Sequence, residues 1–91
     1  MRTIDEILED WLVGKSLRPD DILPIMLEYN NIFCGSKFTE QEITLFLHHP
    51  LVQTELGFAL NNALIMIAKK KGMVWTDVYN QKGKLVARFK N

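Results

Sequence analysis

The fold of this chain is decided by residues 56–68, which read LGFALNNALIMIA. Only Gly57, Asn61 and Asn62 in this stretch are not apolar. A helix that is apolar on nearly every side is normally buried. The stretch therefore predicts a central helix over residues 51–71, which the rest of the chain must cover.

Three shorter helices are expected before the central one. Thr3 with Glu6, and Thr39 with Glu42, have the spacing of capping boxes, in which each residue of the pair satisfies a free backbone N–H of the other. Pro24 must lie in a first helical turn, where the missing N–H of proline costs least. Together with the spacing of the apolar residues, these signals predict helices over residues 3–13, 21–33 and 39–48.

Beyond the central helix, the period of the apolar residues changes to two, which is typical of β-strands. Residues 80–83, NQKG, favour a turn. A C-terminal antiparallel hairpin is therefore expected, with strands over residues 73–79 and 84–90. The whole chain, residues 1–91, is predicted to form a single small domain of the α+β class, mainly α-helical.

Pairing of the strands around this turn predicts which face of the hairpin is buried. One face would carry Val74, Thr76 and Val78 opposite Phe89, Ala87 and Leu85. The other face would carry Trp75, Asp77 and Tyr79 opposite Arg88, Val86 and Lys84. An isolated hairpin is marginal in water. The first face is the apolar one, and we expect it to pack on the helices.

Composition excludes several classes of protein. The chain has 11 basic and 11 acidic residues, 47% hydrophobic residues and one cysteine. The zero net charge argues against a basic nucleic-acid coat or an acidic disordered tail. One cysteine cannot build a disulfide framework or a multi-cysteine zinc site, and it fits a reducing compartment.

Neither a secretory signal nor a membrane helix is expected. The N-terminus turns acidic before any apolar run develops, whereas a signal peptide needs a basic start and an apolar stretch of about 7–15 residues. The most apolar window, residues 56–68, is shorter than the roughly 20 residues that span a bilayer. We therefore expect a cytoplasmic protein with no membrane partner.

No motif indicates catalysis or a cofactor. The chain has no phosphate-binding glycine loop, no H-E-x-x-H and no G-x-S-x-G. His48 and His49 are adjacent, so on a helix they point about 100° apart and cannot both bind one metal; we expect them to cap the end of the third helix. Cys34 is expected to be a small buried apolar residue. We predict a non-enzyme with no catalytic, metal or cofactor residues.

Charge separates along the chain. Residues 1–50 carry a net charge of −5 and residues 51–91 carry +5, by count of 4 basic against 9 acidic and 7 basic against 2 acidic residues. A candidate acidic docking face on the first helix consists of Asp5, Glu6, Glu9 and Asp10. Candidate contacts for a partner or a nucleic acid are Trp75, Tyr79, Lys82, Lys84, Arg88, Lys69 and Lys70. Aromatic residues among basic ones suit a stacking surface for nucleic acid, and both sets also suit ordinary solvated faces. Two alternatives stay open: the first helix neutralises the basic half within the chain, or both charged surfaces are left for partners.

Two functions follow from these patterns. The order of the elements over residues 39–90 is similar to that of a winged helix, which implies a DNA-binding transcriptional regulator that uses helix 51–71 and the basic hairpin. However, a recognition helix needs a polar face to read base edges, and this helix is largely apolar. We therefore favour a small regulatory or adaptor protein that binds an unidentified protein partner. A homodimer through the central helix is one form of this hypothesis, and a phage or plasmid origin would suit it.

Overall fold

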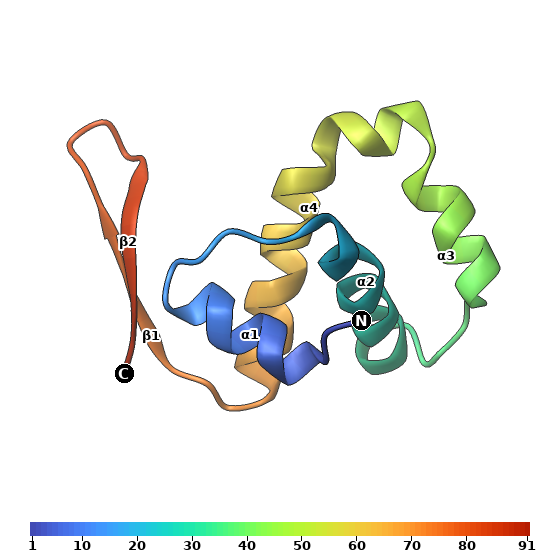
Figure 1. The fold of residues 1–91 in the computed structure, drawn as a ribbon, viewed down its shortest axis with the longest axis horizontal. Helices are drawn as coiled ribbons and strands as arrows, with labels where there is room; N and C mark the ends of the chain where they lie inside the picture. Colours follow the sequence, from blue (N-terminus) through green and yellow to red (C-terminus); the bar gives the residue numbers. More distant parts are fainter.

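The computed structural model describes residues 1–91 without a gap. Four helices precede a two-stranded antiparallel sheet, which confirms the predicted fold class. Each helix begins and ends within one residue of its predicted limit. The elements are α1 (Ile4–Leu12), a 3₁₀ turn (Pro19–Asp21), α2 (Ile22–Phe33), α3 (Glu40–Leu47), α4 (Pro50–Lys70), β1 (Trp75–Tyr79) and β2 (Leu85–Lys90) (Figure 1).

Both predicted capping boxes are formed. The Thr3 hydroxyl accepts from the backbone N–H of Glu6 at 3.2 Å, and the Glu6 carboxylate accepts from the backbone N–H of Thr3 at 3.3 Å. The corresponding distances for Thr39 and Glu42 are 3.1 Å and 3.0 Å. These bonds satisfy N–H groups that have no partner inside the helix, so α1 and α3 begin where local sequence directs.

The junction between α3 and α4 differs from the prediction. His48 is the C-terminal cap of α3, as expected, and its ring Nδ1 lies 2.7 Å from the carbonyl oxygen of Thr44. His49 instead begins α4, because its ring Nδ1 accepts from the backbone N–H of Leu51 at 3.2 Å. Pro50 then occupies the first turn of α4, where it needs no hydrogen-bond donor. The expectation that both histidines cap α3 was therefore wrong for His49.

The core lies where the C-terminal half of α4 packs against α1 and α2 (Figure 1). The first half of α4 projects beyond this core toward α3. The expected burial of α4 is therefore confirmed for its second half only. The buried cluster consists of Ile7, Leu8, Trp11, Leu12, Ile25, Leu60, Ala63, Leu64, Ile67 and Ala68.

By length and composition alone, α4 would also be able to cross a membrane. Its 21 residues include an 18-residue window with a mean hydropathy of 1.3, and 28% of that window is buried inside the protein. Core helices of soluble proteins meet the same criterion. The second half of α4 is packed in the core, whereas Leu51 and Phe58 in its first half are exposed.

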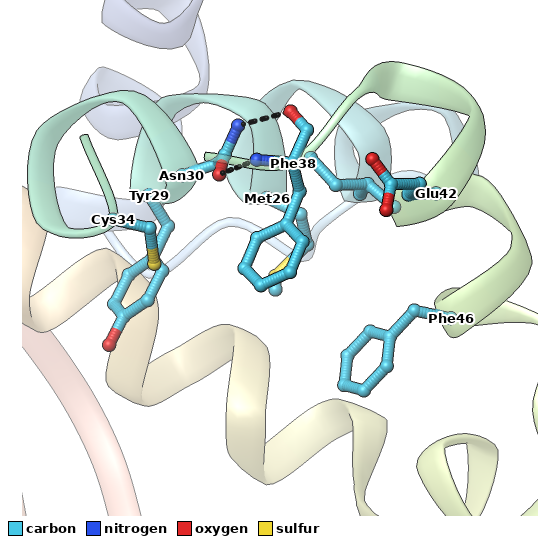
Figure 2. Close-up of a pocket in the computed structure, with 8 residues that line it drawn as sticks. Met26, Tyr29, Asn30, Cys34, Phe38, Glu42 and Phe46 are labelled. Atoms are coloured by element: carbon cyan, nitrogen blue, oxygen red, sulfur yellow. Dashed lines mark hydrogen bonds between the residues drawn. The ribbon is translucent and has the colours of Figure 1, made fainter. Parts of the chain in front are cut away.

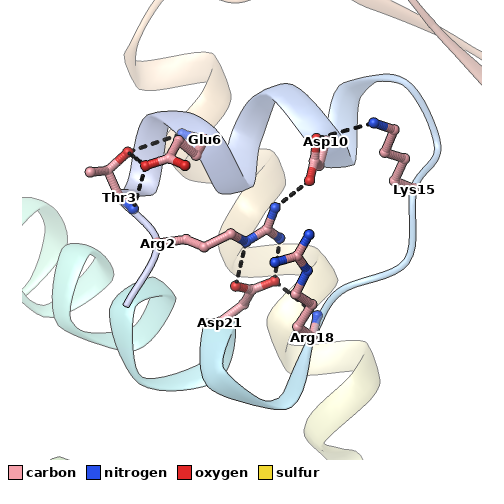
Figure 3. Close-up of polar contacts among 7 residues, drawn as sticks. All are labelled: Arg2, Thr3, Glu6, Asp10, Lys15, Arg18 and Asp21. Atoms are coloured by element: carbon pink, nitrogen blue, oxygen red, sulfur yellow. Dashed lines mark hydrogen bonds and ion pairs between the residues drawn. The ribbon is translucent and has the colours of Figure 1, made fainter.

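A partly buried ion network joins the start of the chain to α1 and to the 3₁₀ turn (Figure 3). Arg2 donates to both carboxylate oxygens of Asp21, at 3.1 Å and 2.6 Å, and also to the carboxylate of Asp10. Asp21 is fully buried and accepts a further bond from the backbone N–H of Arg18 at 2.8 Å. The hydrogen bonds from Arg2 hold the pKa values of Asp21 and Asp10 below the usual range.

The observed strand register differs from the predicted one. Val78 pairs with Ala87 rather than with Leu85, a shift of two residues, and an irregularity follows between Val78 and Tyr79. A shift of two residues leaves each side chain on its own face of the hairpin. The face that was expected to pack on the helices therefore persists, and we call it the uncharged face. It carries Val74, Thr76, Val78, Ala87 and Phe89.

The orientation of the hairpin on the helices is the reverse of the one predicted. Val74, Val78 and Phe89 are exposed, whereas Trp75 is half-buried and Arg88 is buried. The prediction that the uncharged face packs on the helices is therefore wrong. The opposite face, which carries the ion pair and the tryptophan, contacts α1 instead.

Trp11 on α1 explains this orientation. Its ring lies edge-on to that of Trp75, with centroids 5.1 Å apart, and the guanidinium of Arg88 lies 3.9 Å from the centroid of the Trp11 ring. Arg88 also donates to the Asp77 carboxylate at 2.7 Å and to the Trp11 carbonyl at 3.4 Å. The buried cation is thus compensated by a carboxylate, a carbonyl and an aromatic face, and the same guanidinium lowers the pKa of Asp77.

Candidate protein-binding groove

The basic and aromatic candidates of α4 and the hairpin do not form one surface in the structure. Trp75 and Arg88 are engaged with Trp11, so they do not present a stacking surface to solvent. Tyr79 is exposed, and its hydroxyl donates to the Asp77 carboxylate at 3.4 Å. The four remaining candidates are exposed lysines without a carboxylate within 4.0 Å; they are Lys69, Lys70, Lys82 and Lys84.

The acidic candidates of α1 have partners within the chain. Asp5 lies 3.6 Å from the ammonium of Lys71, and Glu9 lies 2.5 Å from that of Lys90. Glu6 is occupied in the capping box and Asp10 in the ion network. Ion pairs at this exposure contribute little to stability. The acidic face is therefore partly neutralised by the basic half of the same chain.

A third surface, which lies between α2, α3 and the first half of α4, is lined mainly by apolar side chains. The chain reverses between α2 and α3 at Gly35 and Ser36, both of which have φ of 59°. Buried Asn30 then holds the reversed segment, because its amide donates to the Phe38 carbonyl at 2.9 Å and accepts from the Phe38 N–H at 3.2 Å. These two bonds fix the segment that leads into α3 against α2, and a hollow remains between the two helices (Figure 2).

Two adjoining hollows form this surface, which we call the apolar groove. The first has a volume of about 460 Å³ and is lined by Met26, Tyr29, Asn30, Cys34, Phe38, Glu42, Ile43 and Phe46. The second has a volume of about 270 Å³ and is lined by Met26, Phe46, Leu47, Leu51, Val52, Glu55, Leu56 and Ala59. Met26 and Phe46 line both hollows, so the groove is continuous from α2 to α4.

The side chains of the groove suit apolar recognition. In Figure 2, Phe38 and Phe46 point into the space between the helices. The carboxylates are Glu42 and Glu55, and the backbone N–H of Thr39 lowers the pKa of Glu42. No group of three or more histidine, cysteine, aspartate or glutamate side chains is placed to hold a metal ion. The groove can accommodate an apolar segment, and its own lining includes two carboxylates.

Sequence reasoning did not name the residues of this groove. Cys34 was expected to be buried, but it is only half-buried and lines the first hollow. The available signal was the apolar excess of residues 50–60 together with the apolar stripe of α3, including Phe46 and Leu47. What could not be read from the sequence is how α3 lies relative to α2, since this depends on tertiary contacts such as the bond from Asn30 to Phe38, eight residues away.

Comparisons with protein-family models, with curated proteins and with solved structures found no match.

Proposed function

We propose that this protein is a small non-enzymatic regulator or adaptor that acts in the cytoplasm by binding protein, and that the apolar groove receives an apolar helix of the partner. The observation that carries the proposal is the pair of adjoining hollows, of about 460 and 270 Å³, which are lined mainly by apolar side chains. Concave sites lined mainly by apolar side chains with a few polar groups are a common form of binding site.

A helix is the partner element that best suits the groove. Helix-in-groove recognition uses apolar anchors on one side of an amphipathic helix, and the two hollows could each take one such anchor. Glu42 and Glu55 lie at the groove, where a cationic group from any part of the partner would complement them. Met26, which lines both hollows, has the flexible side chain that adapts to differently shaped apolar groups.

Photo-crosslinking in cells tests this proposal. Benzoyl-phenylalanine placed at position 46 is expected to give a covalent protein adduct, because the native Phe46 side chain lines both hollows. The substitution Ala59→Arg, which fills the second hollow, should reduce the adduct about tenfold or more. The same reagent at position 13, an exposed apolar site outside the groove, serves as the control. Absence of any adduct at position 46, or an adduct that Ala59→Arg leaves unchanged, would contradict the proposal.

DNA binding remains the second candidate, and the four lysines without carboxylate partners favour it. Lys82 and Lys84 lie at the turn of the hairpin, whereas Lys69 and Lys70 end α4, near the opposite end of the hairpin (Figure 1). Separate basic clusters offer less to a duplex than a continuous basic face does. If protein binding is the function, a labelled duplex should show no salt-dependent affinity. Affinity that falls steeply between two salt concentrations, and that Lys82→Ala with Lys84→Ala removes, would favour DNA binding instead.

A further inference from the structure

The first half of α4 has an apolar side that no other element of the chain covers. Leu51 and Phe58 are seven residues apart, which is two helical turns, so they lie on the same side of the helix. Their exposed fractions are 73% and 72%. Exposure of two large apolar side chains to water is unfavourable. Binding of a partner that covers them would therefore be favoured by the free energy of burying these side chains.

The molecule exposes more surface than a compact monomer of its mass. Its accessible surface is 6262 Å², against about 5,500 Å² expected for a monomer of 10.6 kDa. The excess of roughly 800 Å², to which the projecting hairpin also contributes (Figure 1), is of the same order as the share that one subunit contributes to a protein interface of standard size. The radius of gyration, 13.7 Å, is likewise larger than the roughly 12 Å expected for a compact chain of this length.

We infer that the groove, if it binds protein as proposed above, binds a second copy of this chain: in a two-fold dimer, the first half of each α4 lies in the apolar groove of the other copy. A two-fold contact requires one surface that carries both a projection and a hollow. This surface has both, because Leu51 is exposed at the edge of the second hollow, which it lines, and Phe58 is exposed two helical turns further along α4. Their spacing of seven residues is that of anchors in helix-in-groove recognition.

The charges on this surface also suit a second copy. Lys37 lies next to the groove, with its ammonium 5.4 Å from the centroid of the Phe38 ring, and no carboxylate lies within 4.0 Å of it. Glu55 stands on α4 between the two anchors and likewise has no cationic partner. When α4 of one copy crosses the α2–α3 end of the other, Glu55 approaches the partner's Lys37, and the two-fold axis repeats the contact.

Light scattering over a concentration series tests the dimer. The wild-type chain is expected to approach twice 10.6 kDa as its concentration rises. The substitution Phe58→Ser should weaken dimerisation about tenfold or more, because an aromatic anchor is lost. The matched control is Phe89→Ser, which removes another exposed phenylalanine, 58% exposed, from the hairpin and should leave the dimer unchanged.

A charge exchange at surface positions tests the same contact without touching an apolar side chain. Lys37→Glu and Glu55→Lys should each weaken the dimer, and the double variant should restore it, since each contact then regains opposite charges. Lys84→Glu, a change of the same kind at the hairpin turn, should have no effect. Failure of the double variant to recover any of the loss would overturn the inference.

Three other results would overturn it. The first is that the wild-type chain stays monomeric throughout the series. The second is that Phe89→Ser weakens the dimer and Phe58→Ser does not. The third is that the chain is monomeric and sediments with phosphatidylcholine vesicles, and that Phe58→Ser abolishes this sedimentation. The crosslink at position 46 separates this inference from the proposed function. An adduct with a different protein and a monomeric chain would overturn the dimer alone, whereas no adduct of any kind would overturn both.

Discussion

Replacement of Trp11 by alanine is expected to lower the free energy of unfolding by about 3–5 kcal/mol, the usual cost of truncating a buried tryptophan. Trp11 is 4% exposed. Its indole N–H donates to the side-chain oxygen of Asn61 on α4 at 3.2 Å, and its ring contacts both Trp75 and Arg88. Truncation therefore opens a cavity in the core and also removes the surface on which the hairpin rests.

The second consequence distinguishes this variant from an ordinary core truncation. A two-stranded hairpin is marginal without a supporting surface, so the amide protons of β1 and β2 should exchange with solvent much faster in Trp11→Ala than in the wild type. Urea denaturation measures the loss of stability, and hydrogen exchange measures the release of the hairpin. Trp11→Phe keeps an aromatic ring and should lose about 1–2 kcal/mol. A loss below about 1 kcal/mol for Trp11→Ala would show that α1 and the hairpin do not hold each other.

Replacement of Asp21 by alanine is the second large effect, with an expected loss of about 3 kcal/mol. Asp21 is fully buried and accepts two bonds from Arg2 and one from the backbone of Arg18 (Figure 3). Its removal leaves Arg2 with Asp10 alone and frees the start of the 3₁₀ turn. Thermal unfolding at neutral pH measures the loss. The control is Asp20→Ala, a neighbouring exposed aspartate without a salt bridge, which should change stability little.

The same network makes stability depend on acid. The pKa values of Asp21 and Asp10 are lowered in the folded protein, chiefly by the hydrogen bonds from Arg2. Groups with a lowered folded pKa contribute stability that is present above the unfolded value, about 3.9, and is lost as the pH falls through the folded value. The wild type should therefore lose stability below about pH 4, and Asp21→Ala should lose less over the same interval. An equally steep loss in the variant would contradict this assignment.

The predicted helices were close to those observed because their limits depend on neighbouring residues. Thr3 with Glu6 and Thr39 with Glu42 satisfy backbone groups within three residues, so no distant part of the chain can change that choice. His49 is a residue whose role its neighbours in the sequence do not determine. A histidine at such a junction can serve the helix before it or the helix after it, and the bond to the N–H of Leu51 depends on the direction in which α4 leaves.

The buried face of the hairpin could not be predicted from the hairpin alone. By apolar content, the face with Val78 and Phe89 should be buried. The face with Trp75 and Arg88 is buried instead, because Trp11 offers an aromatic ring to both of them. That partner lies more than sixty residues away in the chain, and an arginine compensated by a carboxylate, a carbonyl and a ring can be buried at low cost.

For the candidate site, too, some features could be predicted from the sequence and others could not. The sequence indicated an excess of apolar surface on the central helix and two charged halves, and from these it predicted protein binding, which remains a prediction. It did not decide whether the basic half is neutralised by α1 or left free for a partner; in the structure, Asp5 pairs with Lys71 and Glu9 with Lys90, which neutralises part of both halves. Nor did it indicate the groove, since the spacing of α2 and α3 depends on the bonds between Asn30 and Phe38.

The sequence by itself determined the helices, the hairpin and the apolar excess of α4, because capping, turn chemistry and periodicity act over a few residues. Only the tertiary structure decided which half of α4 is covered, which face of the hairpin is buried and where the groove lies. The physical reason is that burial is shared between surfaces: α1 and α2 cover one half of α4 and leave Leu51 and Phe58 exposed. Such a choice depends on the shape and charge of every other element, which no local pattern contains.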